Sequence, residues 1–117
     1  MEPPFIVEKI EKWTIIQFRL NSLMDPVVLE DLAHKLYPII DEQDQRRIVL
    51  DFERVEFLSS QAIGIVLTIK KKLSTLPGGK LVLCGVGARL AELLKITRLD
   101  KMLIIKPTQR EAVRTAL

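Results

Sequence analysis

The sequence predicts an α/β fold, with a mixed β-sheet and helices packed around it in a single domain covering residues 1–117. Residues 48–50 and 81–84 are short apolar runs without alternating polar side chains. Such runs indicate strands covered on both faces, as in the interior of a parallel sheet. A segment with helical spacing follows each run, and this alternation is typical of α/β layers joined by right-handed crossovers.

The composition is that of a globular domain. Apolar residues make up 48% of the 117 positions and charged residues 28%, which suffices for one core. The net charge of +3 is too small to indicate direct nucleic-acid binding. No apolar run is long enough to cross a membrane and the N-terminus has no signal-peptide pattern, so we expect a cytoplasmic protein.

The elements are expected in the order β-β-α-β-α-β-α-β-α. Residues 5–10 and 13–20 predict a hairpin whose first strand lies at a sheet edge and whose second strand buries one face. Asp25 and Pro26 mark a helix start, as N-cap and first helical residue. Pro38 lies inside the pattern of this helix and predicts a kink or an early end. The helix should bury one apolar face, formed by Val28, Leu29, Leu32, Leu36 and Ile39.

The second half of the chain continues the alternation. A strand at residues 48–52 leads through a polar bend to a helix that runs from Ser60 to about Leu76. The breaker Pro77-Gly78-Gly79 ends that helix. The remaining elements are a strand at residues 80–84, a tight turn at 85–87, a short helix, a strand at 102–106 and a terminal helix opened by a Thr108–Glu111 capping box.

The helix that follows Ser59 and Ser60 has two distinct faces. Its core stripe should consist of Ala62, Ile65, Val66, Ile69, Leu73 and Leu76. Ile63 and Leu67 fall off this stripe and predict partly exposed apolar surface beside the serines. Gly64 points away from the core, although glycine in a helix costs about 1 kcal/mol relative to alanine. Close approach by another chain and chance explain this glycine equally well.

The sequence contains no recognisable catalytic, metal or cofactor site. His34 lies in the middle of a helix, and the lone Cys84 lies in an apolar run where we expect a small core side chain. No His/Cys cluster has metal-ligand spacing, and the glycines at 85 and 87 lack the third glycine of a dinucleotide fingerprint. Asp51, at a strand end, either sits in a functional crevice or caps the following loop.

The region around the two serines resembles the STAS domain, the module of sulphate transporters and anti-sigma factor antagonists. The resemblance is carried by a strand ending in Asp, a Val-x-Phe-Leu segment, a Ser-Ser pair and a helix start with Ile-Gly, which here are Leu50-Asp51, Val55-Glu56-Phe57-Leu58, Ser59-Ser60 and Ala62-Ile63-Gly64. The STAS fold has the element order given above. The resemblance therefore extends to nearly the whole chain.

The resemblance implies a switched interaction domain and not an enzyme. In antagonist members of the family, the serine matching Ser60 is phosphorylated by a partner that is both anti-sigma factor and serine kinase. The unphosphorylated form binds this partner and frees a sigma factor, and a serine phosphatase resets it. Ser60 is then the expected phosphoacceptor, with Ser59 as the alternative, and the expected partner-binding residues are Ser59, Ser60, Ile63, Gly64 and Leu67. A STAS scaffold or regulatory subunit that is never switched is the other interpretation.

Overall fold

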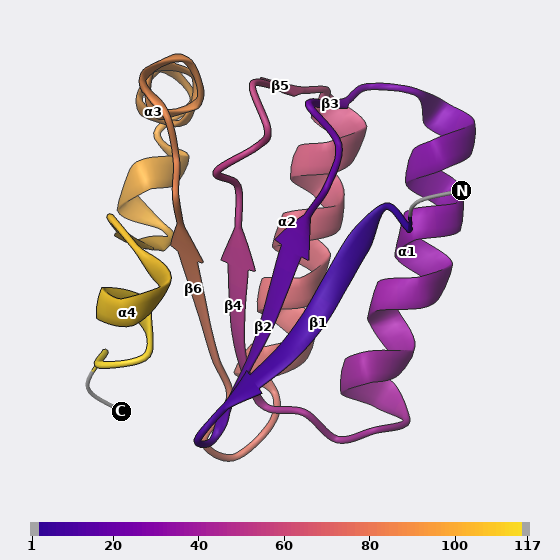
Figure 1. Cartoon of the computed structure of the whole chain (residues 1–117), viewed down its shortest axis with the longest axis vertical. Coiled ribbons are helices and arrows are strands. Elements are labelled where there is room, and N and C mark those ends of the chain that lie inside the picture. The colour runs from indigo at the N-terminus through magenta and orange to yellow at the C-terminus, as the bar shows by residue number, and fades with distance from the viewer. Residues whose placement is uncertain (1–2, 116–117) are drawn as a thin grey trace.

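The structure is a computed structural model that describes residues 3–115. Its main sheet has five strands in the order β1-β2-β4-β6-β7 (Figure 1). β1 is antiparallel to β2 and all other neighbours are parallel, so the sheet is mixed, as predicted. The strands are β1 Phe5–Ile10, β2 Trp13–Phe18, β4 Arg47–Asp51, β6 Lys80–Cys84 and β7 Ile104–Lys106.

The helices follow the strands in the predicted order. They are α1 Pro26–Asp41, α2 Ser60–Ser74, α3 Ala88–Ile96 and α4 Gln109–Ala112, with a 3-10 turn, η1, at Leu99–Lys101. None of the helices within residues 3–115 is long and apolar enough to cross a membrane. Two short strands that the sequence did not predict, β3 Ser22–Leu23 and β5 Phe57–Leu58, pair in parallel outside the main sheet.

Both faces of the main sheet are covered. Side chains at alternate strand positions point to opposite sides of a sheet, and here each side packs into a core of its own. Leu50 and Leu83 belong to the larger core, which contains the buried residues of α1, α2 and α3. Val49 and Val82 belong to a smaller core with Ala112 of α4. β4 and β6 are therefore interior strands buried on both faces, as their apolar runs predicted.

β2 is also buried on both faces, so the single buried face expected for it is wrong. Ile16 lies in the larger core and Ile15 in the smaller one, and each is 1% exposed. Trp13, at the start of β2, lies in the smaller core together with Ala112. The short C-terminal helix therefore covers a face that the alternation in β2 assigned to solvent.

Helix α1 continues through Pro38 to Asp41, so the early end predicted there is also wrong. Proline inside a helix lacks an N–H and costs about 3 kcal/mol. Ile39 and Ile40 follow the proline directly, and both are buried in the larger core. Burying each isoleucine contributes about 1.5–3 kcal/mol. Packing of the last turn therefore offsets the cost of the proline.

Backbone amides in β4 and β6 should exchange with solvent more slowly than those in β1. Interior strands open only when large parts of the domain unfold, whereas an edge strand opens locally. Native-state hydrogen exchange at residues 48–50 and 81–84, compared with residues 5–10, measures the difference. Faster exchange in the interior strands than in β1 would contradict this assignment.

Candidate functional site

The two serines lie where the chain enters α2, beyond the carboxyl ends of the parallel strands. β3, β5, the start of α2 and α3 all lie at this end of the molecule (Figure 1). In open α/β sheets, the carboxyl ends of the strands are where functional groups collect. The geometry of this end depends on how β4 passes into β5.

A buried carboxylate fixes the start of that connection. Asp51, the last residue of β4, is 2% exposed. Its Oδ1 accepts a hydrogen bond from the backbone N–H of Glu53 over 2.9 Å. Its Oδ2 accepts from Nε2 of Gln17 over 3.3 Å and from Nε2 of Gln109 over 2.6 Å. These contacts favour the loop-capping role for Asp51, because they tie the loop, β2 and α4 to the end of β4.

Gly85 leaves the space that this arrangement needs. Its φ is +66°, a conformation in which a side chain is strained. A Cβ at this position would lie 2.7 Å from Oδ1 of Asp51 and 2.8 Å from the backbone nitrogen of Glu53. The tight turn predicted at residues 85–87 therefore exists because the chain after β6 passes directly against the Asp51 loop.

Cys84, at the same strand end, is a buried core residue, as predicted. Burial raises the pKa of its thiol to about 12, with smaller contributions from the charges of Asp51 and Glu53. Because the thiolate is the reactive form, this thiol is a poor nucleophile near neutral pH. Within residues 3–115, no group of three or more His, Cys, Asp or Glu side chains could hold a metal ion.

The small second sheet holds the serines beside the segment that leads into α1. The backbone N–H of Glu56 donates to the carbonyl of Asn21 over 2.7 Å. The backbone N–H of Ser59 donates to the carbonyl of Leu23 over 3.1 Å. The residues that follow Leu23, up to the N-cap Asp25, are thereby kept next to the start of α2. No sequence pattern predicted this pairing, because a two-residue strand is too short to show a period.

The structure gives the two serines different roles. Ser59 is the N-cap of α2, and its half-buried Oγ accepts a hydrogen bond from the backbone N–H of Ala62 over 3.2 Å. Ser60 is the first residue of the helix and is exposed, and its hydroxyl bonds to no residue in the described part of the chain. The Ser60 hydroxyl is therefore the one available to an incoming group.

Exposed apolar side chains lie in the segments that adjoin this helix start. Val27 is 77% exposed, Met24 50% and Phe57 39%. The guanidinium of Arg89, at the start of α3, lies over the Phe57 ring at 4.9 Å from its centre. The sequence analysis missed these residues, although Val27 does lie off the apolar stripe predicted for α1. We call the group formed by Met24, Val27, Phe57, Ser59, Ser60 and Gly64 the serine surface.

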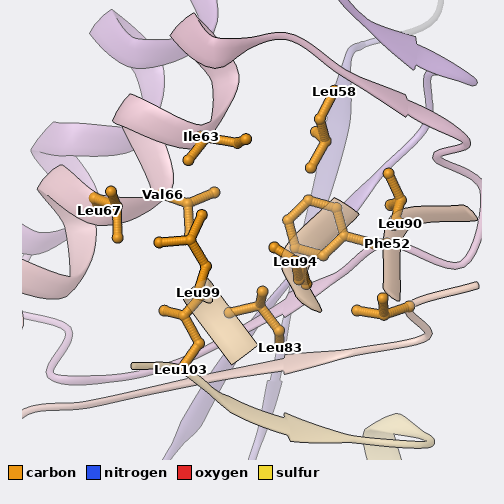
Figure 2. Close-up of a pocket in the computed structure, with 11 residues that line it drawn as sticks. Phe52, Leu58, Ile63, Val66, Leu67, Leu83, Leu90, Leu94, Leu99 and Leu103 are labelled. Atoms are coloured by element: carbon orange, nitrogen blue, oxygen red, sulfur yellow. The ribbon is translucent and has the colours of Figure 1, made fainter. Parts of the chain in front are cut away.

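Ile63 and Leu67 border the serine surface without forming its exposed part. Both are half-buried and line an apolar hollow between α2 and α3, opposite Leu90 and Leu94 (Figure 2). The hollow measures about 10 Å³, which is about the space of one water molecule. It is a packing gap between leucine side chains and too small for a ligand. A charged residue at position 67 would therefore lower stability as well as change the surface.

Gly64 is exposed on α2, one helical turn after Ser60. A Cβ at this position would meet no atom within 4 Å. Its backbone dihedrals are helical, so the fold itself does not require glycine here. The bare backbone of Gly64 is thus an open patch directly beside Ser60.

Comparison with known proteins assigns the family. Residues 6–112 match the STAS domain. The chain belongs to the STAS domain family. The fold agrees, since an anti-sigma-factor antagonist (STAS) domain protein from Planctomyces limnophilus has a TM-score of 0.81 at 24% identity, over 94% of each chain.

Other STAS relatives include proteins described as anti-sigma factor antagonists. BtrV of Bordetella bronchiseptica, assigned as such an antagonist, is 31% identical to this chain over 78 residues. The match covers 67% of this chain and 66% of BtrV, just under two thirds of that relative. The Bacillus cell fate determinant SpoIIAA in its phosphorylated form shares the fold, with a TM-score of 0.71 and 22% identity over 94% of this chain and 96% of SpoIIAA.

Gly85→Ser should lower the free energy of unfolding by about 1–3 kcal/mol, because a side chain at positive φ is strained and would press on Asp51 and the Glu53 backbone. Urea denaturation measures the change. Gly87→Ser is the matched control, because Gly87 is the N-cap of α3 with φ −76° and no atom within 4 Å of its Cβ position. Serine is a good N-cap, so the control should be neutral or slightly stabilising. Equal losses at both glycines would contradict the contact with Asp51.

Proposed function

We propose that this STAS domain is an anti-sigma factor antagonist switched by phosphorylation of Ser60. In the unphosphorylated form, its serine surface binds an anti-sigma factor that has serine kinase activity, and a sigma factor is released. The partner phosphorylates Ser60, binding is lost, and a serine phosphatase restores the first state. One observation carries the proposal: an exposed serine with an unbonded hydroxyl lies at a helix start among exposed apolar side chains.

The contacts of the two serines support Ser60 as the phosphoacceptor, with Ser59 as the alternative. A kinase must bring the hydroxyl oxygen in line with a γ-phosphate, which requires a free and accessible group. The Ser59 hydroxyl already accepts from Ala62 N–H, and its modification would disturb the cap of α2. Losing a serine cap costs about 1 kcal/mol, whereas modification of Ser60 leaves the cap in place.

A phosphate on Ser60 suits the folded domain. The backbone N–H groups of Ser60 and Gln61, in the first turn of α2, donate to no described residue. Free N–H groups and the helix dipole stabilise an anion at this end. The phosphate adds nearly two negative charges, and their desolvation against a partner is unfavourable. The modification therefore changes binding and leaves the fold intact.

The exposed side chains of the serine surface suit a protein partner. Val27, Met24 and Phe57 are three large apolar groups that the fold leaves in water, in the segments that adjoin the start of α2. Apolar and aromatic side chains of this kind are typical of the centre of an interface. Ile63 and Leu67 border the surface as half-buried side chains that pack toward α3. Gly64 lets a partner approach the backbone of α2.

In this proposal the domain performs no chemistry of its own and needs no cofactor. The phosphoryl group comes from the ATP of the partner kinase, and the phosphatase removes it. The domain supplies a hydroxyl in a fixed position and a surface whose affinity changes. The site of action would be the cytoplasm, where sigma factors and their regulators work.

Ser60→Asp should fold normally and bind the anti-sigma partner at least a hundredfold more weakly, since a charge conflict of several kcal/mol corresponds to that loss. Ser60→Ala should bind like the wild type and accept no phosphate. Titration calorimetry with the cognate anti-sigma factor and intact-mass measurement after incubation with ATP test both statements.

The matched serine distinguishes the two positions. Ser59→Ala should still accept one phosphate, with a small loss of stability from the missing cap. Phosphate that persists in Ser60→Ala and disappears in Ser59→Ala would move the site to Ser59. No transfer to either serine, with undiminished binding by Ser60→Asp, would leave the unswitched scaffold as the function.

Gly64→Ala should raise the free energy of unfolding by about 0.5–1 kcal/mol, because alanine is the better helix former and the position is open. The same change should weaken binding of the anti-sigma partner, because a methyl group would keep its backbone from close approach. Thermal denaturation and calorimetry of one preparation test both effects. Stabilisation without loss of affinity would remove Gly64 from the interface.

Two exposed residues provide a control for the serine surface as a whole. Val27→Asp changes a residue of that surface that is 77% exposed, and Ile96→Asp changes one that is 70% exposed at the far end of α3 from Arg89. Neither change should alter the thermal midpoint by much. Only Val27→Asp should weaken binding, and equal losses would indicate a general effect of charge.

A further inference from the structure

A second surface, with basic side chains and an exposed methionine, lies at the other end of α2. A groove runs between the last turns of α2, the start of β6 and the segment entering β7. Its floor contains Leu73 and Leu81, and its sides include Lys70, Ser74, Met102 and Ile104. Lys70 lies ten residues after Ser60, which is about 15 Å along a helix at about 1.5 Å per residue.

The methionine at the rim of this groove is left largely exposed by the fold. Met102 follows η1 and is 54% exposed, although it lies beside Ile104 and the buried Leu81. A long, flexible thioether at the rim of an apolar floor adapts to a partner of varied shape. The exposed side of Met102 therefore offers apolar contact area to another molecule.

The charged side chains that line the groove are all basic. Lys70 makes no ion pair with any residue in the range 3–115, in contrast to Lys72, whose Nζ lies 2.8 Å from Asp41. Lys80 lines the same groove, and Lys71 and Lys101 are exposed close by in the sequence. No Asp or Glu side chain lines the groove, so its charged lining is cationic. The charge complementary to this groove is negative.

The position of β7 makes the groove accessible. β7 is the last strand of the five-stranded sheet, so one side of it has no neighbouring strand among the described residues. Ile104, its first residue, lines the groove. A segment that lies in the groove therefore meets the apolar floor, the Lys70 ammonium and the start of β7 together.

We infer that this groove is a docking site for an acidic, amphipathic segment of a partner protein. The apolar side of the segment would lie on Leu73, Leu81 and Met102, and its carboxylates would face Lys70 and the neighbouring lysines. The serine surface and the groove lie at opposite ends of α2, so both can be occupied at once. The inference stands independently of the phosphorylation switch, because no residue is shared between the two surfaces.

The test uses the whole chain, labelled with ¹⁵N, and a synthetic peptide of about ten residues that alternates Glu and Leu. Saturable amide shifts are expected at Lys70, Ser74, Met102 and Ile104, with none at Ser60. A peptide of equal length with Lys in place of Glu should not bind. Raising the salt from about 50 to about 200 mM should weaken binding, since the attraction is partly electrostatic.

Matched variants locate the effect. Lys70→Glu and Met102→Asn should each weaken peptide binding about tenfold, as expected for loss of a charge or an apolar contact worth about 1.4 kcal/mol. Lys12→Glu, in the exposed turn between β1 and β2, and Val27→Asn, on the serine surface, should bind like the wild type.

Three outcomes would overturn the inference. Shifts that spread equally to lysines outside the groove, such as Lys12, would show general attraction of charge. Equal binding of the Glu and Lys peptides would show that the groove does not distinguish negative from positive peptide charge. Tighter binding to phosphatidylserine vesicles than to the peptide, with the same loss in Lys70→Glu, would assign the groove to an anionic membrane surface instead of a protein.

Discussion

The buried carboxylate of Asp51 is the constraint on which the functional end of this domain depends. A charge removed from water is tolerated only where donors replace the solvent. Here the donors come from the loop at Glu53, from Gln17 in β2 and from Gln109 in α4. One side chain thus joins three parts of the chain that are far apart in sequence. Gly85 completes the arrangement, because any larger residue would collide with the carboxylate.

The route from Asp51 to Ser60 is short, and its hydrogen bonds leave the chain little freedom. Glu56 and Ser59 are bonded through their N–H groups to Asn21 and Leu23, so β5 cannot move without β3. The Ser59 hydroxyl then caps α2 by accepting a hydrogen bond from the backbone N–H of Ala62. What remains exposed is a single serine hydroxyl in a fixed place among apolar groups. This arrangement suits recognition by another protein, because rigid placement lowers the entropy lost on binding.

Helix α2 contributes residues to both proposed surfaces, one at each of its ends. The residues that face the sheet are buried along its whole length and hold it as a rigid element. Its N-terminal end offers a hydroxyl and free N–H groups, which suit a phosphate. Its C-terminal end offers lysines, which suit acidic groups and also complement the helix dipole. A single helix therefore presents opposite chemistries at its two ends without any change in the fold.

The sequence by itself determined the interior strands, the N-caps at Asp25 and Thr108, the core stripe of α2 from Ala62 to Leu73 and the STAS family. These features depend on residues close together in the chain, whose spacing and caps act locally. Tertiary structure alone decided that α1 passes through Pro38 and that β3 pairs with β5. It also decided that Ile63 and Leu67 pack toward α3 and are half-buried. Other apolar side chains stay exposed, namely Met24, Val27 and Phe57. Each of these outcomes depends on contacts between residues far apart in the chain, and no local pattern specifies which distant face a side chain will meet.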